Sequence, residues 1–200
     1  MSFFKRKSKE KKFWDWFSQH ASIYFEFEKD QMNLFTQLKN QLNFINKDLV
    51  FEFSPVFSDG SRELVISSDG IKSAFPFVEK LVAAAPKIKN WKIVAFRQPR
   101  KNIAQIRYEN LLISLDDVFF RYVKNNGLLE LELHLKGFYP SPEWTSAVFL
   151  ILDNVLGEYH TEMSIDSIEK KTLAEEQRSG LFPIRSLPSI LENYKLEFNN

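Results

Sequence analysis

Asn126-Gly127 constrains the fold of this chain more than any other pair of residues. The dipeptide separates two apolar and aromatic runs, "DVFFRYV" and "LLELELHL". Asn-Gly favours a type I′ turn, because both residues accept positive φ angles, and this turn joins two antiparallel strands in a fixed register. We therefore predict a hairpin of strands near 117–124 and 128–135, with paired residues equally distant from the turn.

This register sorts the hairpin side chains into two faces. Phe120 opposite Leu133 and Tyr122 opposite Leu131 form the predicted core face. The other face pairs Arg121 with Glu132, Val123 with Glu130, and Phe119 with His134. Glu130, Glu132 and His134 are the candidate catalytic residues, because a histidine and two carboxylates can perform acid–base chemistry. The alternative is a half-solvated sheet face with a single Arg121–Glu132 ion pair.

Hydrophobic periodicity predicts the remaining elements. Two helices carry apolar stripes over 13–21 and 35–45, and a third, capped by Ser73, covers 73–85. A fourth helix begins at Ser141-Pro142 and ends before Gly157. Strands are predicted near 49–54, 63–67, 91–96, 106–114 and 158–166, and a short terminal helix near Ser186.

The order of these elements predicts an α+β fold. Residues 47–100 and 101–170 each read as a β-β-α-β unit, which suggests a pseudo-repeat that builds one largely antiparallel sheet. A basic lead, 1–12, and a helical segment, 13–46, precede the two units, and a C-terminal extension, 171–200, follows them. We expect residues 13–200 to form a single domain.

Composition excludes several classes of chemistry. The chain has no cysteine, so it forms no disulfide, Cys-based zinc site or thiol nucleophile. It contains no Walker or G-x-G-x-x-G sequence and no HExxH motif, so we expect no cofactor and no metal. No apolar run approaches the length of a membrane span, and no signal peptide is recognisable, so we expect a cytoplasmic protein.

Two clusters of basic residues are candidate contact sites for anions. The first is the lead, which precedes Phe13, Trp14, Trp16 and Phe17 and could touch a membrane surface or nucleic acid. Its basic residues are Lys5, Arg6, Lys7, Lys9, Lys11 and Lys12. The second cluster contains Arg97, Arg100 and Lys101. For the lead, a simply solvated charged tail is the preferred interpretation, and for the second cluster loop solubility explains the charges equally well.

Ser-Asp-Gly occurs twice, at 58–60 and 68–70. We expect Asp59 and Asp69 to accept hydrogen bonds from nearby backbone N–H groups, as in Asx turns. Gly60 and Gly70 then take positive φ angles. The tripeptides therefore mark chain corners rather than reactive groups.

The stretches "ELVISSDG", "FPFVEKLVAAAP" and "WKIVAFRQPR" resemble an uncharacterised family of bacterial cytosolic proteins. Its members open with an aromatic helix similar to "FWDWF" here, and the resemblance covers Phe13 to about Val123. The resemblance implies a bacterial, cytosolic α+β protein. It implies no particular activity and assigns no catalytic residue.

Three functional hypotheses follow. The first is a non-catalytic interaction or regulatory module, because catalytic motifs are missing and aromatic residues are abundant, with 20 phenylalanines. Its partner is another protein or a second copy, in a homodimer. The alternatives are a small-molecule or metal-dependent hydrolase that uses Glu130, Glu132 and His134, and a peripheral membrane or nucleic-acid binder that uses the basic lead.

Overall fold

A computed structural model describes residues 7–198. For Glu175, Gln177 and Phe198 it describes the backbone alone. The chain divides into two compact units, Met1–Arg97 and Gln98–Asn200. The prediction from sequence was a single domain from residue 13 onward, with the boundary between its two β-β-α-β segments after residue 100. Each unit has its own hydrophobic core.

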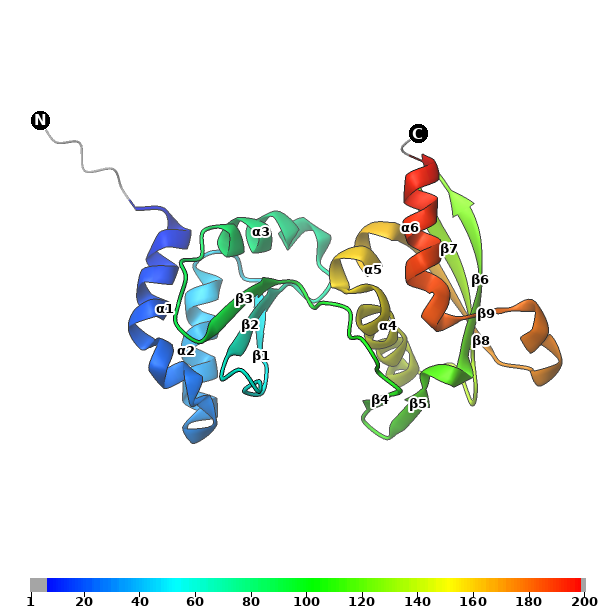
Figure 1. Cartoon of the computed structure of the whole chain (residues 1–200), viewed down its shortest axis with the longest axis horizontal. Helices are drawn as coiled ribbons and strands as arrows, with labels where there is room; N and C mark the ends of the chain where they lie inside the picture. Colours follow the sequence, from blue (N-terminus) through cyan, green and yellow to red (C-terminus); the bar gives the residue numbers. More distant parts are fainter. Residues whose placement is uncertain (1–6, 199–200) are drawn as a thin grey trace, which may run out of the picture. The chain divides into compact units, whose positions relative to one another are not determined.

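The first unit packs three helices against a three-stranded sheet (Figure 1). Its elements are α1 (Lys9–Phe25), α2 (Gln31–Asn43), β1 (Val50–Phe53), β2 (Arg62–Ser67), α3 (Phe75–Ala83) and β3 (Trp91–Ala95). The strand order is β1-β2-β3, with β1 antiparallel and β3 parallel to β2. The parallel pair requires a crossover, and α3 supplies it.

Aromatic side chains build the core of this unit and tie its helices together. The indole nitrogen of Trp14 donates to the carbonyl oxygen of Leu81 at 2.7 Å, which links α1 to α3. The hydroxyl of Tyr24 donates to the carbonyl oxygen of Leu34 at 3.1 Å. Burial raises the pKa of Tyr24 to about 12. Polar ends of large rings are thus satisfied inside the core.

The two Ser-Asp-Gly corners differ in detail. Gly60 and Gly70 have φ angles of 75° and 77°, as predicted. Asp59 forms the predicted Asx turn, because its Oδ1 accepts from the backbone nitrogen of Ser61 at 2.9 Å. The carboxylate of Asp69 instead accepts from Arg97 at 2.5 Å.

The start of the third helix also differs from the prediction. Ser73 does not cap it: a 3₁₀ turn over Lys72–Ala74 leads directly into α3, which has no side-chain cap. Pro76 lies in the first turn of α3, as expected.

The second unit contains a four-stranded sheet and a separate two-stranded hairpin. Its elements are β4 (Gln105–Tyr108), β5 (Leu111–Ser114), β6 (Val118–Asn125), β7 (Leu128–Leu135), α4 (Pro142–Leu156), α5 (Glu158–Ser164), β8 (Ile165–Thr172), β9 (Phe182–Pro183) and α6 (Leu187–Phe198). The four-stranded sheet has the order β8-β7-β6-β9. Residues of α4 and α6 form one core with the inner face of β6 and β7.

The predicted hairpin and its register are confirmed. Asn126 and Gly127 have φ angles of 47° and 82°, and β6 pairs antiparallel with β7 so that Phe120 faces Leu133 and Arg121 faces Glu132. Phe120 and Leu133 are fully buried, as the core face requires. The fourth helix is also confirmed, since Ser141 Oγ accepts from the Trp144 nitrogen.

The strand predicted over 158–166 is wrong for most of its length. Glu158–Ser164 form α5, and the strand β8 starts only at Ile165. The buried residues Glu158, Thr161 and Ser164 recur every three positions, which is helical spacing. The strand predicted over 106–114 is likewise two strands, β4 and β5, joined at Glu109, whose φ is 47°.

The α+β class is confirmed, but the sheets are mixed rather than one largely antiparallel sheet. In both units a hairpin is followed by a helical crossover and a third strand parallel to the second, with spatial orders β1-β2-β3 and β6-β7-β8. The two halves therefore share strand pairing as well as element order. No helix in the part of the chain from 7 to 198 has both the length and the apolar character needed to cross a membrane.

Candidate functional site

The best-formed candidate site is a hollow in the first unit, where the start of α1 lies beside the end of α2. We call it the α1–α2 hollow. It has a volume of about 590 Å³, within the range of small-ligand and peptide-anchor pockets. Its lining residues are Lys7, Lys9, Lys12 and Phe13 from the beginning of the described chain, and Gln41, Phe44 and Ile45 from α2 and the residues after it.

Ser8 fixes the backbone on one side of the hollow. Its side chain accepts from the backbone nitrogen of Lys11 at 3.2 Å and so caps α1. The helical period then places Phe13 in the core, where it is 2% exposed, while the lysines of this turn stay at the surface. The lining therefore combines an apolar floor with a cationic rim.

Two of the nearby lysines are already paired. Lys7 and Lys11 bind the carboxylate of Asp15 at 2.7 and 3.2 Å. Hydrogen bonds from Lys7 and then Lys11 lower the pKa of Asp15. Lys9 and Lys12 form no ion pair with any described residue, so their charges are available to a bound anion.

Phe44 gives the hollow its exposed aromatic edge. It follows α2 directly and keeps 70% of its surface exposed, while its neighbour Ile45 is 8% exposed. The predicted apolar stripe of the second helix, Phe35, Leu38, Leu42 and Ile45, does not include Phe44. An aromatic residue outside the buried stripe is the sequence signal that could have located this surface.

The basic lead contributes to the hollow, but three of its four aromatic neighbours are buried, and the fourth, Trp16, is partly buried against the same core. Lys5 and Arg6 lie outside the described residues. Phe13, Trp14 and Phe17 are 2%, 2% and 0% exposed in the core of the first unit. These three rings are therefore not available to enter a membrane interface in this fold, which leaves Trp16 alone of the four aromatic residues in that hypothesis.

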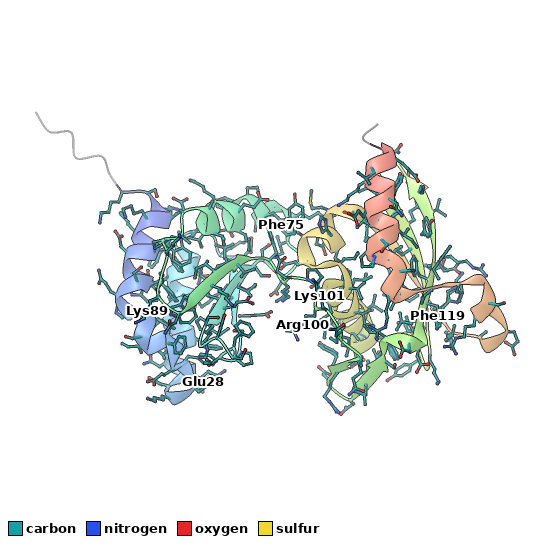
Figure 2. The ribbon with its side chains drawn as sticks, in the orientation of Figure 1. Glu28, Phe75, Lys89, Arg100, Lys101 and Phe119 are labelled. Atoms are coloured by element: carbon teal, nitrogen blue, oxygen red, sulfur yellow. The ribbon has the colours of Figure 1, made fainter. Side chains whose placement is uncertain are left out.

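The second predicted anion cluster is divided between the units. Arg97 donates to the carboxylates of Glu52 and Asp69. Although burial lowers the pKa of Arg97, hydrogen bonds to Asp69 and Glu52 raise it above its ordinary value. Arg100 and Lys101 belong to the second unit and are exposed next to each other, on the segment that leads from β3 to β4 (Figure 2). Arg97 is thus committed to two carboxylates of its own unit.

The candidate catalytic residues on the hairpin do not form one group of three. His134 is 2% exposed, and its Nε2 lies 2.6 Å from Oε1 of Glu132. Oε2 of Glu132 accepts from Lys171 at 2.7 Å rather than from Arg121. Glu130 is bonded elsewhere, by the side-chain nitrogen of Asn125 at 2.8 Å.

Charge pairing on this face favours an ionised Glu132. Hydrogen bonds from Lys171 and then from His134 lower the pKa of its carboxyl below the ordinary value. Nδ1 of His134 is buried without a hydrogen-bond partner in the described part of the chain. What the structure brings together is therefore a histidine–carboxylate–lysine chain, and Glu130 lies outside it.

The described residues contain no cluster of three or more His, Asp or Glu side chains that could hold a metal ion. His160, which the sequence placed on a strand between Glu158 and Glu162, lies on α5. Its Nδ1 is 3.0 Å from the Lys195 ammonium. Burial first and the charge of Lys195 second lower the pKa of His160.

Comparison with known proteins finds no protein-family model that matches this chain and no matching curated protein. The resemblance to an uncharacterised bacterial family therefore remains a prediction from sequence.

Proposed function

We propose that this chain is a non-catalytic protein-interaction or regulatory module that binds its partner through the α1–α2 hollow. The observation that carries the proposal is Phe44, which is 70% exposed at the rim of a hollow with a buried apolar floor. Burying an aromatic side chain of this kind against a partner is worth about 1.5–3 kcal/mol. Aromatic residues, phenylalanine included, are enriched in protein interfaces relative to the rest of the surface.

The chemistry of the hollow supports binding rather than catalysis. Its lining side chains are three lysines, one glutamine and three apolar residues, so they include no carboxylate, imidazole or hydroxyl group. Lysine usually becomes a catalytic base or nucleophile when it is desolvated in an apolar pocket, whereas Lys7, Lys9 and Lys12 are exposed. The hydrolase alternative depends on Glu132 and His134 on the other unit, without Glu130.

Two kinds of partner are consistent with this proposal. One is a different protein of a bacterial cytosol, the compartment that the sequence predicts. The other is a second copy of the chain, which would make a homodimer. Both use the same contact surface, so a single experiment can separate them.

Site-specific photo-crosslinking tests the proposal. A photoreactive phenylalanine analogue replaces Phe44 in the full chain, and the control carries it at Met32, which is 85% exposed near the start of α2. We expect a protein adduct in cells from position 44 and none from position 32. An adduct of twice the mass of the chain identifies a homodimer, whereas mass spectrometry identifies any other partner.

The identified partner is then purified, and its binding is measured against Phe44→Ala and Met32→Ala variants. We expect the first substitution to weaken binding at least tenfold, equivalent to about 1.4 kcal/mol, and the second to leave it unchanged. The proposal is wrong if position 44 yields no adduct, or if both substitutions have the same effect.

A further inference from the structure

We infer that the occupant of the α1–α2 hollow is an acidic, amphipathic segment of the partner protein. This inference rests on the proposed function and adds the chemistry of the bound segment. It follows from three features of the hollow: its charge, its apolar floor, and the burial of the aromatic residues that adjoin the basic lead.

The charge of the hollow is one-sided. Among the described residues that line it, three are lysines and none is acidic. Asp15 engages Lys7 but leaves Lys9 and Lys12 without an ion-pair partner among the described residues. Glu10, the acidic residue between them, is 6% exposed and binds Lys80 at 2.9 Å. Electrostatic complementarity therefore selects carboxylates in the partner.

The apolar floor requires more than charge in the bound segment. Phe13 and Ile45 are buried at its base, and Phe44 stands exposed beside them. A segment that places leucine or phenylalanine side chains on the floor and carboxylates toward Lys9 and Lys12 satisfies both parts. An amphipathic helix presents such residues at spacings of three and four, as in helix-in-groove recognition.

A peptide fits these observations better than a lipid surface. Membrane-bound basic segments insert aromatic rings at the interface, but Phe13, Trp14 and Phe17 are committed to the core. Trp16 is partly buried against the same core, and Phe44 borders a concavity and does not form a protruding anchor. A convex peptide helix can enter such a hollow and contact its floor and its lysines together.

Fluorescence anisotropy with the full chain and synthetic peptides tests this inference. The probe is a labelled peptide of about 15 residues, with leucines on one helical face and glutamates on the other. Its comparison peptide has lysine in place of every glutamate. A third arm uses vesicles of equal parts phosphatidylglycerol and phosphatidylcholine. We expect the acidic peptide to bind at least tenfold more tightly than the basic one, and no vesicle binding.

Charge-reversal variants assign the binding to the hollow. The Lys9→Glu/Lys12→Glu variant should weaken binding of the acidic peptide at least tenfold and strengthen binding of the basic peptide. The matched control is Lys47→Glu/Lys87→Glu, which makes the same change in net charge at two exposed lysines outside the hollow. Circular dichroism of each variant checks that the fold is retained. Because all four lysines are exposed, we expect no loss of helix signal.

Several results would overturn the inference. The first two are equal binding of the two peptides and no binding of the acidic peptide. The third is an equal loss of acidic-peptide binding in the two double variants. The fourth is vesicle binding that Lys9→Glu/Lys12→Glu abolishes. A protein adduct at position 44 together with any of these results retains the proposed function and rejects the acidic segment. Absence of that adduct rejects the proposed function itself.

Discussion

The guanidinium group of Arg62 donates to both carboxylate oxygens of Glu28, at 2.5 and 3.1 Å. Arg62 is 3% exposed at the first position of β2, and its Nη1 also donates to the carbonyl oxygen of Phe25 at 2.8 Å. The guanidinium carbon lies 4.6 Å from the ring centre of Phe27. Figure 2 shows Glu28 at the turn between α1 and α2, so this pair joins the helical hairpin to the sheet.

Arg62→Ala should therefore destabilise the first unit strongly. The substitution removes three hydrogen bonds and a buried side chain, and it leaves a cavity between Phe25 and Phe27. We expect the free energy of unfolding to fall by about 2–4 kcal/mol. Urea unfolding followed by tryptophan fluorescence measures the loss, since Trp14 and Trp91 belong to this core.

Lys92→Ala is the matched control for Arg62. Lys92 also lies in the sheet of this unit and pairs with Asp59, but it is half-exposed. Exposed pairs contribute less than about 1 kcal/mol, so its loss should be small. If both variants lose the same free energy of unfolding, the Arg62–Glu28 pair stabilises the unit no more than an exposed ion pair does.

The pair of Glu10 and Lys80 makes the stability of the first unit depend on pH. A hydrogen bond from Lys80 lowers the pKa of Glu10 from 4.5 to about 2. The native state therefore holds this carboxyl ionised while the unfolded chain protonates it near 4.5. Its contribution is complete above that pH and disappears as the pH falls toward 2.

The Glu10→Gln variant isolates this effect, because its amide stays neutral at every pH. Lys80 is largely exposed, so solvent screening limits the stability difference from wild type to about 1–2 kcal/mol near neutral pH. We expect the difference to shrink when urea unfolding is repeated near pH 3. Glu26→Gln, at an exposed pair with Lys29, serves as the control. A difference for Glu10→Gln that is the same at both pH values contradicts the assignment.

Local turn chemistry explains which parts of the fold were predictable. Asn126-Gly127 fixes the register of its hairpin through two positive φ angles. Each residue pair between β6 and β7 could therefore be predicted by counting outward from the turn. Residues 158–164 misled the prediction, because "EYHTEMS" places polar residues at every second position and Tyr, Thr and Met between them, as a half-buried strand does. Gly157, with φ 82° and ψ 150°, ends α4 and at once begins α5, so one glycine serves two helices. Alternation alone does not reveal that geometry.

The candidate site was only partly predictable for a similar reason. The cationic lead was visible as a run of charges, and its lysines do border the hollow. The other wall depends on α2 folding back so that Phe44 comes close to Lys9 and Lys12, residues more than thirty positions earlier. Contacts over that separation depend on tertiary packing, which helical periodicity does not specify. Likewise, Glu132 accepts a hydrogen bond from Lys171 and not from Arg121 because β8, which comes later in the chain, lies beside β7.

Trp14 and Phe44 should respond oppositely to substitution, although both are aromatic residues of the first unit. Trp14 is 2% exposed and hydrogen-bonded to Leu81, whereas Phe44 is 70% exposed. Trp14→Phe should lower the free energy of unfolding by about 2–3 kcal/mol, because it leaves a cavity and removes the hydrogen bond from the indole to Leu81. Phe44→Ala should change it by less than about 0.5 kcal/mol. A large loss for Phe44→Ala in thermal unfolding would assign that ring to the core rather than to a binding surface.

Gly127 offers the sharpest test of the hairpin in the second unit. Its φ of 82° is a left-handed angle that strains any residue with a Cβ, and its N–H donates to the hydroxyl of Tyr194 at 2.9 Å. Gly127→Ala should lower the free energy of unfolding by about 1–2 kcal/mol. Gly180→Ala is the matched control: Gly180 lacks a positive φ, and a Cβ there meets only the Arg121 side chain at 3.9 Å. We expect the control to lie within about 0.5 kcal/mol of wild type, measured by urea unfolding and far-ultraviolet circular dichroism. If the two alanine variants are equally stable, backbone conformation at Gly127 does not hold the register, and the apolar pairing of Phe120 with Leu133 must do so alone.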